Sequence, residues 1–224
     1  MVIALFILMV VIFLTAEYFS LSKKISATAE VNSDVHLPVS TEIIERYFHR
    51  GHSWVLVQSA KKVIAGVDDF SQRFIGKVGD IELPQAGSVV RQGEIIATMK
   101  HGDKILPTVA PVSGTILEVN TRLKETPSMI NDSPLEKGWI VKMAPQDLTL
   151  DLRNLFKGVT ADRWQEAVRA HLIHWFSPRL GTVMQDGGEI VENVSDLTNS
   201  EEWRILVDEF FPSSLSNTHT SPLE

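Results

Sequence analysis

The sequence predicts a mainly β fold, a small sandwich or barrel, with an N-terminal transmembrane helix and a C-terminal α-helical extension. Short strand-like runs separated by Gly, Pro and Asp follow one another from residue 52 to residue 143, as they do in small all-β domains. An apolar run opens the chain, and helical spacing of apolar residues replaces the strand pattern towards its end. We expect five segments, at residues 1–22 (membrane anchor), 23–39 (linker), 40–158 (β domain), 159–212 (helical extension) and 213–224 (disordered tail).

The composition excludes several classes of function. The chain has 224 residues, a net charge of −7 and no cysteine. Disulfides, thiol nucleophiles and cysteine-ligated metals are therefore excluded. No basic run interleaved with aromatic residues occurs in the sequence, so we expect no nucleic-acid partner.

The first segment reads MVIALFILMVVIFLTA and contains no charged residue. The apolar run from residue 2 to residue 21 is interrupted only by Glu17 and is as long as a bilayer requires. Lys23 and Lys24 follow the run, so the positive-inside tendency predicts a single-pass membrane protein with a cytoplasmic globular domain. A cleaved signal peptide ending near Ala27–Ala29 is the alternative. It is disfavoured because no basic residue precedes the run.

The β domain is predicted to begin with a short helix and to continue as strands. Ser40 or Thr41 is placed to cap a helix whose apolar face would pack against the sandwich. That face comprises Ile43, Ile44, Tyr47 and Phe48. A strand is expected at Lys62–Val67, and Asp68 or Asp69 is placed to cap a single helical turn after it. Other strand-like pieces lie at residues 54–58, 76–83 and 89–90.

A β-hairpin and a further strand organise the middle of the chain. Ile95–Met99 predicts the first strand, His101–Asp103 the turn and Ile105 the start of the return strand. The turn motif A-P-x-S-G then leads to a strand at Thr115–Val119.

Apolar residues at helical spacing define the C-terminal extension. Asp147 or Thr149 is expected to start a short helix reaching Leu155. A longer helix is predicted from Thr160 to about Phe176, ended by Pro178. One of its faces carries Trp164, Val168, His171 and Trp175.

A last helix is predicted to follow a hairpin turn at Asp186–Gly188. Thr198 and Glu201 form a capping-box pattern ahead of an apolar stripe that includes Trp203. A small sandwich has limited surface on which to bury the apolar stripes of both long helices. We therefore expect the helical extension to be the main partner-binding element, with burial of both stripes in the core as the alternative.

None of the candidate catalytic or metal-binding residues forms a convincing site. Paired acidic residues occur in loops and strands, at Asp68, Asp69, Asp80 and Glu82. No G-x-S-x-G motif, phosphate loop or nucleotide fingerprint is present, so we expect no enzymatic activity. His171 and His174 have a spacing that can share a metal, but Glu166 is poorly placed as a third ligand, so we expect no metal site.

Several motifs in one order give the chain a family resemblance. They read GHSWVLVQ, GVDDFSQRFIGKVGDIELPQAG, GEIIATMKHGDKILPTVAPVSGTILEV, PSMINDSP and KGWIVKM. From about His52 to Leu155 the chain resembles the H-protein of the glycine cleavage system, with His52 as the first residue of its H-x-W element, where it would pack beside Trp54. The resemblance implies a barrel-sandwich hybrid fold of the lipoyl-carrier type. It also implies lipoate on a lysine at the hairpin tip and three enzyme partners: a decarboxylase, an aminomethyl transferase and dihydrolipoyl dehydrogenase.

The residue at the position of the carrier lysine is Asp103. In the family that lysine lies ten residues after the glycine that opens the hairpin strand and eight before the proline of A-P-x-S-G, and Gly93 and Pro111 keep this spacing. Lys104 lies one place late, and Lys100 falls where the family has an acidic residue. Moving Lys104 to the tip would slip the return strand by one residue and turn its side chains to the opposite face.

We therefore expect no lipoyl cofactor. The leading hypothesis is a membrane-anchored, non-enzymatic docking or scaffold subunit with protein partners. The alternative is a working lipoyl carrier that shuttles an aminomethyl or other thiol-bound group on Lys104 or, less readily, on Lys100.

Overall fold

The computed structural model describes residues 45–180 and 193–214 of the chain. The predicted membrane anchor, the linker, the hairpin turn at Asp186–Gly188 and the tail after residue 214 lie outside the described residues. Within the described ranges, no helix is long and apolar enough to cross a membrane.

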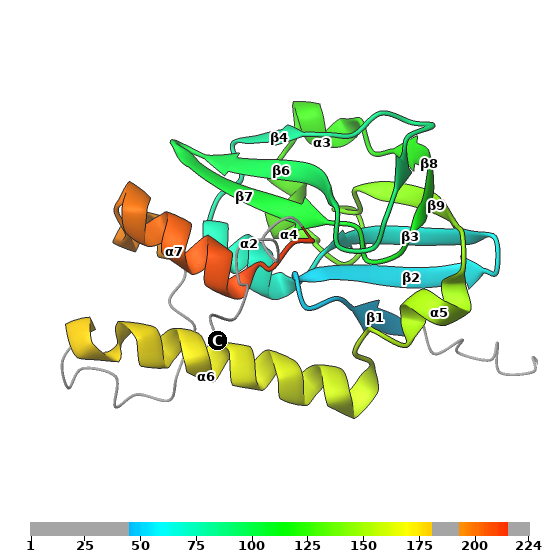
Figure 1. The fold of residues 1–224 in the computed structure, drawn as a ribbon. Helices are drawn as coiled ribbons and strands as arrows, with labels where there is room; N and C mark the ends of the chain where they lie inside the picture. The colour runs from blue at the N-terminus through cyan, green and yellow to red at the C-terminus, as the bar shows by residue number, and fades with distance from the viewer. Residues whose placement is uncertain (1–44, 181–192, 215–224) are drawn as a thin grey trace, which may run out of the picture. The chain divides into compact units, whose positions relative to one another are not determined.

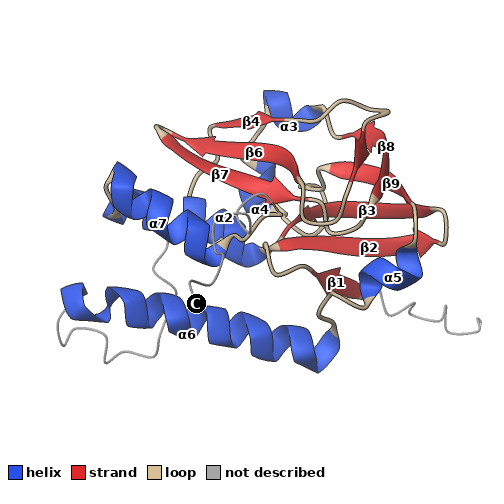
Figure 2. Ribbon diagram, in the orientation of Figure 1, coloured by secondary structure: helices blue, strands red, loops and turns tan. Residues whose placement is uncertain are grey.

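Two antiparallel sheets form the body of the molecule (Figure 2). The larger sheet has the strand order β1-β2-β3-β9-β8-β5, and the smaller has the order β4-β6-β7. The strands are β1 (Arg46–Phe48), β2 (Ser53–Ser59), β3 (Lys62–Val67), β4 (Asp80–Glu82), β5 (Val89–Val90), β6 (Ile95–His101), β7 (Lys104–Val109), β8 (Gly114–Val119) and β9 (Val141–Pro145). The predicted mainly β fold is thereby confirmed.

The core lies on one face of the larger sheet because its strands alternate. Val55, Val63 and Val141 are fully buried. Leu56 and Ile64 point to the opposite face and are partly exposed. The hydrophobic pattern thus fixes which face of each strand is covered.

The predicted helix before β2 is wrong where the structure describes it. Tyr47 and Phe48 lie in β1, paired with Val55 and Trp54 of β2. Phe48 also exchanges two backbone hydrogen bonds with Phe156, each of 2.8 Å. These pairings come from residues distant in the sequence, and they outweigh the local helical spacing.

Short helices lie between the strands and after the last of them. They are α2 (Asp69–Ile75), α3 (Arg122–Glu125), α4 (Met129–Asp132) and α5 (Leu148–Leu152). Asp68 caps α2: its Oδ1 accepts a hydrogen bond of 2.9 Å from the Ser71 amide. Asp147 caps α5 in the same way, because its Oδ1 accepts a hydrogen bond of 3.0 Å from the Leu150 amide. Both aspartates were among the predicted caps.

The helical extension comprises α6 (Gly158–Leu180), the 3₁₀ helix η2 (Val194–Leu197) and α7 (Ser200–Phe210). Helix α6 begins earlier than predicted and continues two residues past Pro178. A proline so near the end removes a single backbone hydrogen bond, so it does not end the helix.

The predicted capping box of α7 is one residue out of register. The Asn199 side chain caps the helix, and the Glu202 carboxylate in turn accepts a hydrogen bond from the Asn199 amide. Thr198 instead donates its hydroxyl to the Val194 carbonyl of η2 at 3.0 Å. Asparagine is the stronger N-cap residue, which favours this register.

Both long helices contribute to the core, but only α7 buries the stripe that the sequence indicated. Trp203, Leu206 and Phe210 of α7 are buried, as are Leu172 and Phe176 of α6. On the predicted face of α6, Trp164, Val168 and Trp175 are half-buried and His171 is exposed. Figure 1 shows α7, coloured orange, beside the hairpin of β6 and β7. The apolar stripe of α7 is therefore not free to bind a partner, because the hairpin and α2 already cover it.

Candidate functional site

The hairpin of β6 and β7 has a two-residue turn at its tip. His101 pairs with Lys104 and Lys100 pairs with Ile105, so Gly102 and Asp103 form the turn. Gly102 has φ 58°, in the left-handed region that glycine adopts at little cost. This register places Asp103 at the tip and Lys104 in the return strand, as the sequence spacing indicated.

Lys104 is buried beside the tip. The residue is only 6% exposed, whereas the Asp103 side chain is 73% exposed. The Lys104 Nζ lies 3.8 Å from Oδ2 of Asp103. A ligase that attaches an acyl group must reach the amine, so the burial of Lys104 argues against modification in this state.

Lys100 lies in β6 and is held by acidic residues of β4. Its Nζ donates to Oε1 of Glu82 and lies 3.9 Å from Oδ2 of Asp80. The hydrogen bond to Glu82 is the main cause that raises the pKa of the Lys100 amine. Acylation requires the neutral amine, so this pairing disfavours reaction. Asp80 and Glu82 are thus explained as charge partners of Lys100, and they need no role as paired catalytic carboxylates.

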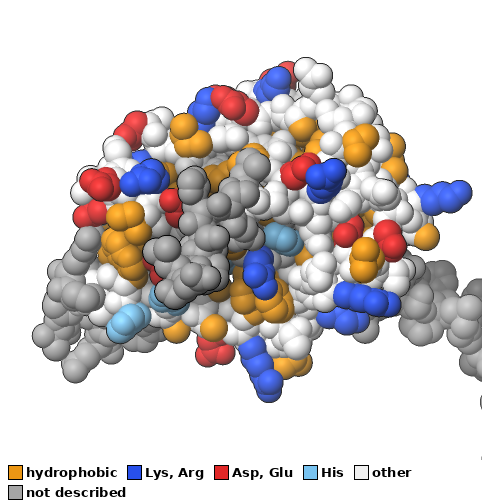
Figure 3. Space-filling model, in the orientation of Figure 1, with side chains coloured by type: hydrophobic (Ala, Val, Ile, Leu, Met, Phe, Trp, Pro, Cys, Tyr) orange, Lys and Arg blue, Asp and Glu red, His pale blue; other side chains and the backbone are white. Residues whose placement is uncertain are grey.

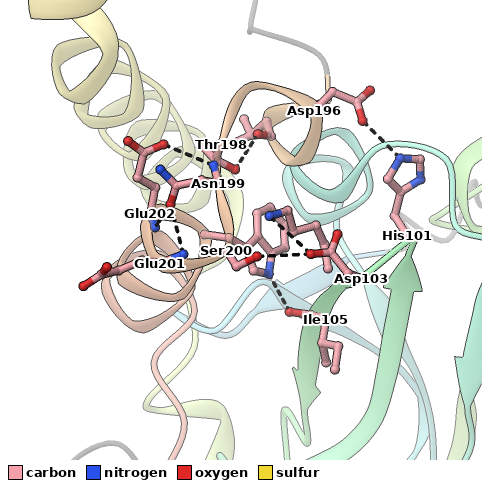
Figure 4. Close-up of polar contacts among 12 residues, drawn as sticks. His101, Asp103, Ile105, Asp196, Thr198, Asn199, Ser200, Glu201 and Glu202 are labelled. Atoms are coloured by element: carbon pink, nitrogen blue, oxygen red, sulfur yellow. Dashed lines mark hydrogen bonds and ion pairs between the residues drawn. The ribbon is translucent and has the colours of Figure 1, made fainter.

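The C-terminal segment closes over the hairpin (Figure 4). Ser200 of α7 donates its hydroxyl to Oδ2 of Asp103 at 3.1 Å. Asp196 of η2 lies 3.2 Å from Nε2 of His101, and the indole of Trp203 donates to the Ile105 carbonyl at 2.9 Å. We call η2 and α7 together the C-terminal cover.

The first turn of α7 is fixed by its cap. Asn199 Oδ1 accepts from the amides of Glu201 and Glu202, each at 3.0 Å, as Figure 4 shows. This cap orients the start of the helix, from which Ser200 reaches the hairpin tip. The apolar pattern predicted the helix and its stripe bearing Trp203, but it did not indicate that the hairpin would cover this stripe.

A second polar cluster lies inside the molecule. The Nδ1 of His52 is 2.8 Å from Oδ2 of Asp68, and the His52 ring stacks between Phe70 and Trp164 with centroid distances of 4.3 and 4.8 Å. The other Asp68 oxygen accepts from the Ser71 amide and hydroxyl. Both His52 and Asp68 are at most 1% exposed. This cluster joins the residue before β2 to the start of α2. His52 is a buried packing residue, but its ring neighbours are Phe70, Trp164 and Phe211 and not the expected Trp54.

The other candidate residues have ordinary surface contacts. His171 pairs with Glu209 of α7 at 2.9 Å, and Asp69 pairs with Arg73 at 2.7 Å. His174 is exposed on α6. In the described part of the chain, no three His, Asp or Glu side chains lie close enough together to hold a metal ion.

Comparison with known protein families identifies the family to which this β domain belongs. The family model described as "Glycine cleavage H-protein" matches residues 46–167, more than half of the chain. The chain belongs to the glycine cleavage H-protein family. The match supports a barrel-sandwich fold of the lipoyl-carrier type for the two sheets.

Two sequence relatives agree with this assignment, and one solved structure is partly similar in fold. The chain is 35% identical to the probable glycine cleavage system H protein of Pyrococcus furiosus over 49% of this chain and 81% of the relative. It is 34% identical to a glycine cleavage system H protein of Thermus thermophilus over 56% of this chain and 94% of the relative. The crystal structure of the H protein from Mycobacterium marinum is 22% identical, with a TM-score of 0.48, and covers 55% of this chain and 96% of that one.

The H-protein match ends inside α6. The C-terminal cover, at residues 194–210, therefore lies beyond the matched residues 46–167. In this chain, a segment outside the matched family region contacts the hairpin of the family region.

Proposed function

We propose that this protein is a membrane-anchored, non-enzymatic docking or scaffold subunit built on the H-protein fold, and that it carries no lipoyl group. The observation that carries the proposal is the state of the hairpin tip. Asp103 occupies the turn and is bonded to Ser200, while Lys104 is buried. An aspartate cannot form the amide that joins lipoate to a carrier.

The C-terminal cover supports the same proposal. A swinging-arm carrier presents its tip to a ligase and then to successive active sites, so the tip must be accessible. Here His101, Asp103 and Ile105 all contact the cover. The hairpin is thus bonded to another segment of the same chain on one side, while the Asp103 side chain itself stays exposed.

The second candidate function is that of a lipoyl carrier shuttling an aminomethyl or other thiol-bound group on Lys104. Membership of the glycine cleavage H-protein family favours it. In that case the decarboxylase, the aminomethyl transferase and dihydrolipoyl dehydrogenase would be the partners. This function would require the buried amine of Lys104 to become exposed.

Intact-mass measurement of the natively purified protein distinguishes the two functions. We expect the mass of the unmodified chain. A mass increase of one lipoyl group that disappears in Lys104→Arg would establish the carrier function and refute the docking proposal.

The membrane anchor and the cytoplasmic location of the β domain are part of the proposal. They rest on the uncharged opening run and on Lys23 and Lys24. We expect N-terminal sequencing to find the first residues retained. A reporter fused after Glu224 should be active in the cytoplasm, and activity only outside it would contradict the topology.

A further inference from the structure

A preformed groove lies on the outer face of the larger sheet, away from the core. Its volume is 640 Å³, within the range of ligand sites. Its floor is one row of side chains in register across five strands, Arg46, Leu56, Ile64, Lys142 and Glu118. The row has an apolar centre with charged residues at both ends.

The wall of the groove is held by hydrogen bonds to the segment between β8 and β9. The Trp54 indole donates to the Pro134 carbonyl at 3.2 Å, and Arg46 Nη2 donates to the Leu135 carbonyl at 2.9 Å. Asn120 donates to the carbonyls of Lys137 and Trp139 at 3.0 and 2.8 Å. These bonds fix the wall without a ligand, so binding would cost little reorganisation.

The groove is positive on an acidic protein. Four basic residues and two acidic residues line it, whereas the whole chain has a net charge of −7. Glu118 is already paired with Lys142 at 2.8 Å. Arg122 and Lys137 are exposed, and neither forms an ion pair with any described residue. Two cations are thus available beside an apolar floor.

We propose that this groove binds an extended acidic segment of a protein partner, with carboxylates on Arg122 and Lys137 and an aliphatic or aromatic side chain over Leu56 and Ile64. Charge complementarity selects an acidic occupant. A nucleic acid fits less well, because its closely spaced phosphates would meet Glu118 and Glu136 at the groove. Acidic and basic side chains are interspersed over the face of the molecule drawn in Figure 3.

The inference rests on the proposed function only in assuming a protein partner. The lipoyl state of Lys104 does not enter it. If the chain is unmodified and the groove binds no peptide, the docking proposal stands and the groove proposal fails. If the chain is lipoylated and the groove binds peptide, the docking proposal fails and the groove proposal stands.

The test uses the full chain in neutral detergent and a fluorescein-labelled octapeptide of alternating glutamate and leucine. We expect saturable binding by fluorescence anisotropy that weakens as salt is raised. The variant R122E/K137E should bind about tenfold more weakly, since two attractive contacts become repulsive. A peptide with serine in place of leucine should also bind more weakly, because the apolar floor loses its contact.

The matched control is K61E/R204E, which makes the same change in net charge at two exposed residues outside the groove lining, one in the turn before β3 and one in α7. It should bind like the wild type, within about twofold. Equal weakening by both double variants would show non-specific attraction and overturn the proposal. Absence of binding to the wild-type chain, or tighter binding of a single-stranded DNA octamer than of the peptide, would also overturn it.

Discussion

The indole nitrogen of Trp203 donates a hydrogen bond to the backbone carbonyl of Ile105 across 2.9 Å, linking the last helix to the return strand of the hairpin. The two residues are 98 positions apart in the chain. Trp203 is 5% exposed, and its ring centre lies 5.0 Å from that of Phe74 in α2. One side chain thus connects α7, the hairpin and the core.

Replacing Trp203 with alanine should strongly destabilise the protein. The change leaves a cavity beside Phe74 and removes the bond to Ile105, so we expect a loss of about 3–5 kcal/mol in the free energy of unfolding. Trp203→Phe keeps most of the ring and should cost ~1 kcal/mol. Urea unfolding monitored by circular dichroism measures both. Trp139→Phe, at the half-buried groove residue, is the control and should change little. A negligible effect of Trp203→Ala would show that α7 does not pack as described.

The amine of Lys104 should react slowly with acylating reagents. Its side chain is 8% exposed, whereas Lys61 lies exposed at the turn between β2 and β3. We expect Lys104 to be acetylated at least about tenfold more slowly than Lys61, because a population in which its amine is exposed must form first. Peptide mapping by mass spectrometry after brief treatment with an N-hydroxysuccinimide ester gives both rates. Similar rates for the two lysines would mean that the amine of Lys104 is not protected in solution.

A lysine placed at the tip should be a better acceptor for lipoate than either natural lysine of the hairpin. Asp103→Lys puts an amine at a position where the present side chain is 73% exposed, and it also removes the bond from Ser200. In cells with a lipoyl ligase, we expect Asp103→Lys to gain the mass of one lipoyl group and the wild type to remain unmodified. Asp103→Arg, which has the same positive charge as the lysine variant but lacks an acylable amine, is the control. Failure of Asp103→Lys to become modified would show that the cover blocks the ligase even when a lysine is present at the tip.

The stability of the protein should fall between pH 6.5 and pH 4 because of His49. Burial, with smaller contributions from Arg50 and His52, lowers the pKa of His49 from 6.5 to about 4. The unfolded chain therefore binds the proton first as the pH falls through this window. The contribution of neutral His49 is complete above pH 6.5 and lost towards pH 4, a change of about 3 kcal/mol.

His49→Asn isolates this contribution. The Nδ1 of His49 accepts a hydrogen bond from the Gly51 amide at 3.0 Å, and an asparagine oxygen can take its place without titrating. The difference in unfolding free energy between wild type and His49→Asn should therefore shift in favour of the variant as the pH falls from 7 to 4. A difference that stays constant over this range would show that His49 is not the titrating group.

The features predicted correctly from the sequence depend on neighbouring residues. The caps at Asp68 and Asp147 lie next to the helices that they start, and the turn at Gly102 lies between two strands of clear β propensity. Strand β1 was mistaken for a helix because its partners, Val55 and Phe156, are not adjacent in the chain.

For the candidate site, the sequence predicted which residue lies at the tip but not which segment contacts the hairpin. The spacing between Gly93 and Pro111 was enough to place Asp103 in the turn. The hairpin is contacted by η2 and α7, which follow about a hundred residues later. The apolar stripe containing Trp203 indicated that α7 must be covered, but periodicity does not identify the covering surface.

The position of β7 gives the C-terminal cover another consequence. In the described structure β7 is an edge strand of the smaller sheet, and edge strands offer unpaired backbone groups to other chains. Trp203 occupies one such group, the carbonyl of Ile105. Loss of α7 would leave that edge open to pairing with a second molecule, so proteolysis or truncation of the helix should lead to self-association and aggregation through exchanged strands.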